Sequence, residues 1–366
     1  MIKKFLISAI LIIPILFGCS EKFDINQLGD YHGAGNAGGD TLYVHVNPDW
    51  GGFNNPQAIL LGKEPFIYVC DTDNDKIVML NTAGTVLGYL SIKKPIAIAQ
   101  DYRLNLIVCA EYDITDNNNI THTYSAVYKI DLFAVNHIIG NAIPKLILPR
   151  TEDISSHPLC KYTAVTAFYD NSYYVARTGT NNTSNSDPDN SIIQFVPVDQ
   201  YHDTTLSNRV PNIDPLRSGM ITANGINCMT SFNKKNIDFI ATFNKGVVNE
   251  TVFKAQWFHF FSTISSSGYQ SGISQFSGVA FVKPDRFGAP TGSCIDPSGN
   301  IYIADGDPGK DSVFKFSPYG DELQSFGGPT VFSKPAGVAF FDRTLYVLDS
   351  QKNIIRRFIL STDLGQ

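Results

Sequence analysis

The chain has 366 residues and a net charge of −6 at neutral pH, with 17% charged and 12% aromatic residues. Its basic residues form no stripe along the sequence, so nucleic acid is not expected as a partner. Residues 41–366 would suffice for two average domains, although all-β folds of this length are often single domains.

The first 18 residues have the three parts of an export signal. Lys3 and Lys4 supply the positive charge, and residues 5–17 form an apolar run that ends before polar residues. A membrane-spanning helix needs about 20 apolar residues, which is more than this run provides. We therefore predict a signal peptide over residues 1–18.

The run closes with Leu16-Phe17-Gly18-Cys19. This segment resembles the lipobox of bacterial lipoproteins, which implies cleavage before Cys19 and acylation of that residue. The alternative is an ordinary signal peptide followed by an incidental cysteine. Ser20 and Glu21 do not resemble the aspartate-type retention signal of the inner membrane. The expected location is the outer membrane, with the protein facing either the periplasm or the cell surface.

Residues 19–40 are predicted to be the lipidated cysteine and a flexible tether, because this polar, glycine-rich stretch buries little apolar surface. Residues 33–38 match the pattern G-x-G-x-x-G. No strand precedes them and no helix follows, so a phosphate-binding loop is not expected there.

Six segments beyond the tether share one pattern, in which aromatic and β-branched residues alternate before a small residue and then a small or polar one. They are residues 66–71, 106–110, 173–177, 238–242, 301–305 and 345–349. Aligned on their last residue, they place Asp71, Ala110, Arg177, Thr242, Asp305 and Asp349 at equivalent positions.

Each of these strands is accompanied by others at regular offsets. Pro56, Pro95, Pro290 and Pro335 open an upstream run, at the position where a strand tolerates proline. Third strands are expected at residues 77–80, 126–130, 192–196, 252–255, 313–316 and 354–358. A weaker fourth strand follows in several units and is clearest at residues 85–90.

Six repeats of four short antiparallel strands predict an all-β, six-bladed β-propeller over residues 41–366. The last unit ends after its third strand, and an orphan strand precedes the first unit at residues 41–46. We expect this N-terminal strand to complete the last blade, which would cover two sheet edges. A seventh blade within residues 206–225 or 260–288 is the alternative.

Residues 290–328 resemble the NHL repeat, with an opening proline, a Gly-Asn turn, a strand ending in Ala-Asp and a Phe-x-x-x-Gly close. The resemblance is clear in half of the units and weak in the three middle ones. It implies that the aligned aspartate braces the following turn through backbone N–H groups. Some propellers of this type are lyases or lactonases with a metal in the central channel. No such motif matches here residue by residue, so no catalytic residue is assigned.

In a propeller, the loops from second to third strands and those between blades leave from one end. The long stretches 111–124, 178–190 and 306–311 follow second strands, and 136–161 and 197–225 are expected to join blades. Because long loops on a rigid scaffold often carry binding sites, this face is the candidate site. Its candidate residues are Asp71, Glu111, Arg177, Thr242, Asp305, Asp349, His122 and His157.

The sequence neither establishes nor excludes a metal site. Residues 181–190 are rich in oxygen-bearing side chains that calcium prefers, although a plain flexible loop is the favoured interpretation. The seven histidines are scattered singly, and we identify no CxxC motif and no Cys/His metal spacing. The repeat register places Cys70 and Cys109 in the core as buried thiols, and the sequence requires no cofactor.

These observations favour a non-enzymatic, lipid-anchored propeller of the cell envelope that binds a peptide, glycan or protein on its loop-rich face. A metal-assisted lyase or hydrolase with its site in the central channel is the alternative. A structural component of an envelope complex is the third possibility and differs from the first only in its partner.

Overall fold

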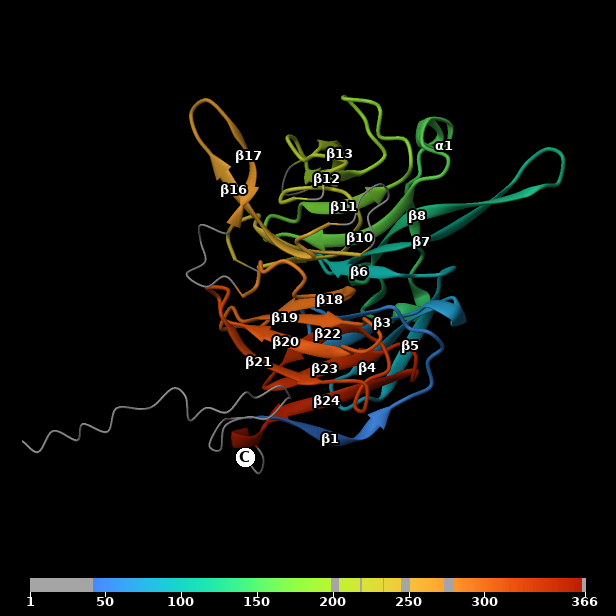
Figure 1. The fold of residues 1–366 in the computed structure, drawn as a ribbon. Helices are drawn as coiled ribbons and strands as arrows, with labels where there is room; N and C mark the ends of the chain where they lie inside the picture. Colours follow the sequence, from blue (N-terminus) through green and yellow to red (C-terminus); the bar gives the residue numbers. More distant parts are fainter. Residues whose placement is uncertain are drawn as a thin grey trace, which may run out of the picture. The chain divides into compact units, whose positions relative to one another are not determined.

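The computed structural model describes residues 42–198, 204–217, 219–232, 234–244, 251–272 and 280–363. Its strands form six four-stranded antiparallel sheets, each made of strands that follow one another in the chain except where β1 joins the last sheet. The innermost strands β2, β6, β10, β14, β18 and β22 each pack against the next, and β22 packs against β2. The predicted six-bladed β-propeller is therefore confirmed (Figure 1).

We number the blades I to VI along the chain and give their strands from the inside outward. Blade I comprises β2 (Ala58–Leu61), β3 (Phe66–Asp71), β4 (Lys76–Asn81) and β5 (Val86–Ser91). Blade II comprises β6 (Ala97–Gln100), β7 (Asn105–Thr115), β8 (Thr121–Asp131) and β9 (Lys145–Leu148). Blade III comprises β10 (Lys161–Ala167), β11 (Tyr173–Thr178), β12 (Ser191–Pro197) and β13 (Thr204–Arg209).

Blade IV comprises β14 (Ile226–Ser231), β15 (Phe239–Phe243), β16 (Ala255–Ser262) and β17 (Ser267–Ser271). Blade V comprises β18 (Pro290–Ile295), β19 (Ile301–Asp305), β20 (Ser312–Phe316) and β21 (Glu322–Gly327). Blade VI comprises β22 (Pro335–Phe341), β23 (Thr344–Asp349), β24 (Ile354–Leu360) and β1 (Tyr43–Trp50). The one α-helix of the described residues, α1 (Thr151–Ser156), precedes blade III, and short 3-10 turns lie at Thr72–Asn74, Phe133–Val135, Ile139–Asn141 and Ser361–Asp363.

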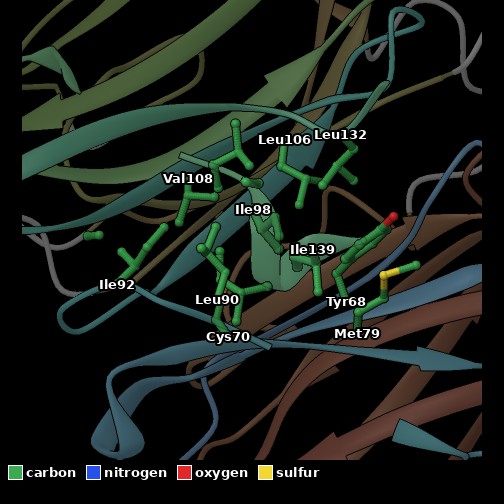
Figure 2. Close-up of a cluster of buried hydrophobic side chains, with 14 residues drawn as sticks. Tyr68, Cys70, Met79, Leu90, Ile92, Ile98, Leu106, Val108, Leu132 and Ile139 are labelled. Carbon is green, nitrogen blue, oxygen red and sulfur yellow. The ribbon is translucent and has the colours of Figure 1, made fainter. Parts of the chain in front are cut away.

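The second strand of each blade is apolar on both faces because each face meets a different neighbour. In β3, Tyr68 and Cys70 pack toward blade II, where they meet Ile98 and Val108 (Figure 2). Ile67 and Val69 of the same strand pack with side chains of blade VI. Full burial of each large side chain stabilises the fold by roughly 1.5–3 kcal/mol. Cys70 and Cys109 are completely buried, as predicted from the repeat register.

Small residues let the innermost strands approach closely around the axis. A Cβ atom on Gly292 of β18 would lie 2.7 Å from the Cα of Gly337 in β22. A Cβ on Gly337 would in turn lie 3.0 Å from the Cγ2 of Ile59 in β2. Blades V, VI and I are therefore in backbone-level contact at the centre of the ring.

Strand β1 pairs antiparallel with β24, so that blade VI has the order β1-β24-β23-β22. Tyr43 faces Leu360 and His45 faces Phe358 in this pairing. The Tyr43 hydroxyl also lies 2.8 Å from that of Tyr302, which connects β1 to blade V. Thr41, the signal peptide, Cys19 and the tether lie outside the described residues. None of the helices within the described residues combines the length and the apolar character of a membrane-spanning helix.

Three details of the predicted strands are wrong. The third strand of blade IV is β16 at Ala255–Ser262 rather than residues 252–255, because Phe258 is the residue that pairs with Phe239 of β15. The stretch 111–124 is largely paired strand: β7 and β8 continue as a ribbon to Thr115 and from Thr121. This ribbon extends well beyond the other strands of blade II (Figure 1).

The third error concerns the stretches expected to join blades. Residues 136–161 include β9, and residues 197–225 include β13, each of which is the fourth strand of its own blade. The true connections into blades III and IV are therefore residues 149–160 and 210–225. The described parts of 206–225 and 260–288 contain no additional sheet, so no seventh blade is found there.

Candidate functional site

The strand register places most of the long loops at one end of the propeller. The start of each first strand pairs with the end of the second, as in Pro290 with Asp305, Pro335 with Asp349 and Tyr162 with Arg177. The connections between blades and the loops after second strands therefore leave from the same end, which we call the loop face. The repeats predicted this end for the long stretches, but the connection between β8 and β9, residues 132–144, joins a third to a fourth strand and leaves from the opposite end.

Three of the candidate residues brace the backbone at this end. Asp71, Asp305 and Asp349 are completely buried. Asp305 accepts hydrogen bonds from the backbone N–H groups of Gly288 and Ala289 at 2.8 and 2.7 Å. It also accepts one from the N–H of Asp307 in the following turn, at 3.2 Å. The carboxylate thus joins the incoming connection to the second-to-third-strand loop.

Asp71 and Asp349 brace the corresponding segments of blades I and VI. Asp71 accepts a hydrogen bond from the N–H of Asn54 at 2.7 Å, and Asp349 accepts one from the N–H of Ser333 at 2.9 Å. Because these carboxylates already have hydrogen-bond partners in the adjoining segments, the bracing role implied by the NHL resemblance accounts for their positions better than ligand binding does.

Two further candidates do not converge with the others. The hydroxyl of Thr242 is buried in blade IV and donates to the Oδ1 of Asn227 at 2.8 Å. Glu111 lies half-buried on the β7–β8 ribbon, with its carboxylate 4.0 Å from the Nζ of Lys93. Thr242 is therefore held within blade IV, and Glu111 is held beside blade II.

His122 is near the tip of the β7–β8 ribbon. Its Nε2 lies 3.3 Å from the Oδ2 of Asp116, and its side chain is 46% exposed. Its ring tilts against that of Tyr124 on the same ribbon. The contacts that hold this histidine therefore come from the ribbon itself.

Arg177 and His157, in contrast, are brought together in blade III. Arg177 occupies the aligned position where three other blades have aspartate, and only 3% of it is exposed. Its Nη2 donates to the Oδ1 of Asp187 at 2.5 Å and to the carbonyl of Pro188 at 2.8 Å. Its Nε donates to the carbonyl of Asp189 at 3.1 Å. Through these hydrogen bonds, Arg177 fixes the conformation of the loop after β11.

His157 follows α1 in the connection between blades II and III. Its Nδ1 lies 2.7 Å from the Oδ1 of Asp189, and its Nε2 lies 2.9 Å from the Oδ2 of Asp187. The thiol of Cys160 is hydrogen-bonded to the same Asp189 carboxylate. We call His157, Cys160, Arg177, Asp187 and Asp189 the His157 cluster.

The electrostatics of the cluster follow from these contacts. Burial acts to raise the pKa of Asp189, but hydrogen bonds from His157 and from the Asn181 amide outweigh it and lower the pKa. The pKa of Asp187 is lowered against burial by His157 and Arg177. Burial, together with the hydrogen bond to Asp189, raises the pKa of the Cys160 thiol to about 12. The cluster therefore holds two carboxylates and a neutral thiol around one imidazole.

The loop after β11 is built to present Asp189. A Cβ atom on Gly179 would lie 2.5 Å from the Oδ2 of Asp189, so only glycine leaves room for the carboxylate. The N–H of Asn181 donates to that Oδ2 at 2.7 Å, and the N–H of Asn190 donates to the Oδ1 of Asn182 at 2.7 Å. The oxygen-rich side chains of residues 181–190 thus include several that are engaged within the loop itself.

The sequence indicated only part of this cluster. Arg177 and His157 are candidates from the sequence, whereas Asp187 and Asp189 belong there only to a polar loop, and Cys160 is not among the candidates. The expectation of no Cys/His metal spacing is wrong, because His157-Pro-Leu-Cys160 is such a spacing. The structure brings ligand atoms of His157, Cys160 and Asp189 within 4.8 Å of one another.

The central channel is the other concave feature, a cavity of about 200 Å³ lined by the innermost strand of every blade. Hydroxyls and thiols gather on the blade IV and V side: the Oγ1 of Thr230 lies 2.7 Å from the Oγ of Ser293, and the Sγ of Cys228 lies 3.6 Å from that same oxygen. Burial lowers the pKa of Lys63 at one margin. The described residues that line this channel include no carboxylate and no imidazole.

No protein-family model matches the sequence, and no curated protein matches it. Among solved structures, a gluconolactonase from Xanthomonas campestris is similar with a TM-score of 0.54 and 11% sequence identity, over 89% of this chain and 99% of that one. The PQQ-bound aldose sugar dehydrogenase from Streptomyces coelicolor gives 0.52 and 11%, over 88% and 99%. A protein of unknown function from Bacteroides thetaiotaomicron gives 0.51 and 12%, over 86% and 73%. At these identities the likeness shows the propeller fold alone.

Proposed function

We propose that this chain is a lipid-anchored protein of the bacterial cell envelope whose propeller binds a peptide, glycan or protein on its loop face. The observation that carries the proposal is the common origin of the long connections. Residues 149–160, the loop 179–190 and the β7–β8 ribbon all leave from the end of the ring where first strands begin. Long loops on a rigid scaffold provide a large and variable binding surface.

The anchor is proposed from the sequence. Residues 1–18 have the parts of a signal peptide, and Cys19 follows in a segment that resembles a lipobox. Each buried methylene of an acyl chain contributes about 0.8 kcal/mol, so several chains on Cys19 would hold the protein firmly in the membrane. The polar residues after Cys19 would then serve as the tether, and we propose the outer membrane as the location.

A metal-assisted lyase or hydrolase is the second candidate. The likeness in fold to a gluconolactonase supports it, and so does the preformed channel. The side chains that line the described channel argue against it there, because hard and borderline metals favour carboxylate and imidazole ligands. Fold alone does not assign chemistry. Binding is therefore the function that we favour.

The anchor is tested by metabolic labelling with a radioactive fatty acid in a bacterial host. The wild-type chain should incorporate label and sediment with the outer membrane. Cys19→Ser should incorporate none and should either retain its uncleaved signal or appear in the soluble fraction. Equal labelling of both chains would contradict the lipoprotein assignment.

Binding is tested on arrays of glycans and peptides with fluorescently labelled protein. Ile120 and Leu159 are exposed apolar side chains on the loop face, and Tyr319 is an exposed aromatic residue in the turn between β20 and β21 at the opposite end. Any ligand of the wild type should bind the double variant Ile120→Ser, Leu159→Ser at least about tenfold more weakly. Tyr319→Ser is the matched control and should bind normally.

The result that would contradict loop-face binding is an equal loss in both variants, or a loss in Tyr319→Ser alone. An enzymatic function would instead appear as turnover of a sugar-lactone panel by the purified protein. Loss of that turnover in Lys63→Met, with binding on the arrays unchanged, would place the chemistry in the channel.

A further inference from the structure

Three different metal-binding side chains meet in the His157 cluster. One ligand atom each from His157, Cys160 and Asp189 lies within 4.8 Å of the others. Among the described cysteines, Cys70 and Cys109 are buried in the core, and Cys228 and Cys294 line the channel. Cys160 is therefore the described thiol that lies on the loop face. It forms no disulfide.

The carboxylate of Asp187 orients the imidazole for this purpose. It lies 2.9 Å from the Nε2 of His157, while the Nδ1 faces Asp189 at 2.7 Å. A metal-binding histidine commonly donates its second ring N–H to a carboxylate, which fixes the tautomer and the direction of the ligand nitrogen. Here Asp187 would retain the proton on Nε2 and leave Nδ1 to face Asp189 and Cys160.

The ligands are also held in place before any ion binds. The side chains of His157 and Asp189 are only 7% and 5% exposed. Arg177 fixes the loop that carries Asp187 and Asp189, and Gly179 leaves the space that the Asp189 carboxylate fills. Both contributing segments, 149–160 and 179–190, flank strands of the same blade. Metal binding therefore requires no movement between blades.

We propose that His157 Nδ1, Cys160 Sγ and an oxygen of Asp189 bind one Zn²⁺ ion on the loop face. Nitrogen, sulfur and oxygen ligands in one set of three are typical of zinc, which prefers four tetrahedral ligands. The fourth position would be taken by water or by an oxygen atom of a bound molecule. Binding releases the thiol proton of Cys160 and the proton shared between Nδ1 and Asp189. This site goes beyond the proposed binding function and depends on neither the anchor nor the partner.

The competing explanation is a purely structural ion pair, in which a protonated His157 bridges Asp187 and Asp189. The two explanations differ in the role of Cys160, which contributes a ligand to a metal but is dispensable for the ion pair. A test must therefore detect the bond between the metal and the Cys160 thiolate.

The experiment uses the full chain, purified in detergent and treated with a chelator, and titrates it with Zn²⁺ or Co²⁺ alone. We expect one equivalent of Zn²⁺ by calorimetry and a thiolate-to-cobalt charge-transfer band in the near ultraviolet. Cys160→Ser should lose that band and bind Zn²⁺ at least about 100-fold more weakly. Cys228→Ser, which changes a thiol in the channel, is the matched control and should keep both. Survival of the band in Cys160→Ser would overturn the proposal.

A second variant tests the orienting carboxylate. Asp187→Asn should keep the charge-transfer band but bind Zn²⁺ about 10- to 100-fold more weakly, because loss of an outer carboxylate weakens a histidine ligand. Circular dichroism of each variant without metal verifies that it is folded. If Cys160→Ser does not fold, the wild type alone remains decisive, since absence of a thiolate-to-cobalt band would show that the cluster is only an ion pair.

Discussion

The aligned aspartates have a structural task that a carboxylate performs well. Two oxygens, each with two lone pairs, accept several backbone N–H bonds from segments that meet at the loop face. In Asp305 these donors come both from the connection before β18 and from the turn after β19. A buried charge is tolerated there because its hydrogen-bond partners compensate for the loss of water.

Asp305→Ala should lower the free energy of unfolding by about 2–4 kcal/mol, because the N–H groups of Gly288 and Ala289 lose their acceptor in a buried place. Asp305→Asn keeps one acceptor oxygen and should lose about half as much. Urea denaturation followed by circular dichroism measures both. A variant Asp305→Ala as stable as the wild type would show that the carboxylate does not brace these segments.

At the level of elements, α1 depends on one residue pair at its start. Asp153 accepts hydrogen bonds from the backbone N–H of Arg150 at 2.8 Å and from its Nε and Nη2 at 2.9 Å each. Burial acts to raise the pKa of Asp153, but the hydrogen bonds from Arg150 outweigh it and lower the pKa. The helix precedes the segment that carries His157 and Cys160, so this pair helps to position the cluster.

The lowered pKa of Asp153 gives a pH dependence with a defined sign. A carboxyl with a lower pKa in the folded than in the unfolded state stabilises the fold above its unfolded pKa of about 3.9 and loses this contribution as the pH falls. Arg150→Gln should therefore destabilise the protein near pH 6, and the difference from wild type should shrink as the pH falls below about 3.9. Urea denaturation across this range measures the difference.

The matched control is Arg217→Gln. Arg217 forms a pair with Asp214 at the same spacing, but its side chain is 73% exposed. Exposed pairs contribute roughly 0–1 kcal/mol. This variant should have almost no effect at any pH. An equal, pH-independent loss in both variants would contradict the role assigned to Asp153.

The pairing of β1 with β24 makes a second prediction at the level of elements. Removing residues 1–50 would expose the whole edge of β24 and would remove Tyr43 and Trp50 from the core. Loss of two large buried side chains should lower the free energy of unfolding by about 3–6 kcal/mol. The open edge should also promote aggregation, detectable by size-exclusion chromatography. Removing only residues 1–41 keeps β1 and should leave both properties unchanged.

At the level of the whole molecule, the ring closes through backbone contacts between innermost strands. Gly292 and Gly337 allow blades V and VI to approach more closely than any side chain would permit. Strain at one contact is transmitted around a closed ring, because no blade can move outward without opening its other interface.

Gly292→Ala should therefore lower the free energy of unfolding by about 1–3 kcal/mol through overpacking against β22. Gly219→Ala is the control, since a Cβ atom there meets no other atom within 4 Å. Thermal unfolding of the two variants measures the difference. Equal stability of Gly292→Ala and Gly219→Ala would mean that the innermost strands can separate without loss of folding free energy.

By itself, the sequence determined the class of fold, the number of blades and the common end from which the loops after second strands and the connections between blades leave. Second strands buried on both faces repeat the same apolar run, and turn residues follow at similar intervals. The pattern can therefore be recognised even in the units that resemble the NHL repeat only weakly. The same register placed Cys70 and Cys109 in the core. These features depend on local periodicity, which is visible without coordinates.

Only the tertiary structure decided what the loops do. His157 and Arg177 could be proposed from sequence, but their meeting with Asp187, Asp189 and Cys160 depends on two irregular segments that have no repeating period. In the same way, the ribbon of β7 and β8 arose from a stretch expected to be a loop. Short-range patterns specify strands, whereas contacts between residues distant in the chain are set by how irregular backbone packs on the finished scaffold.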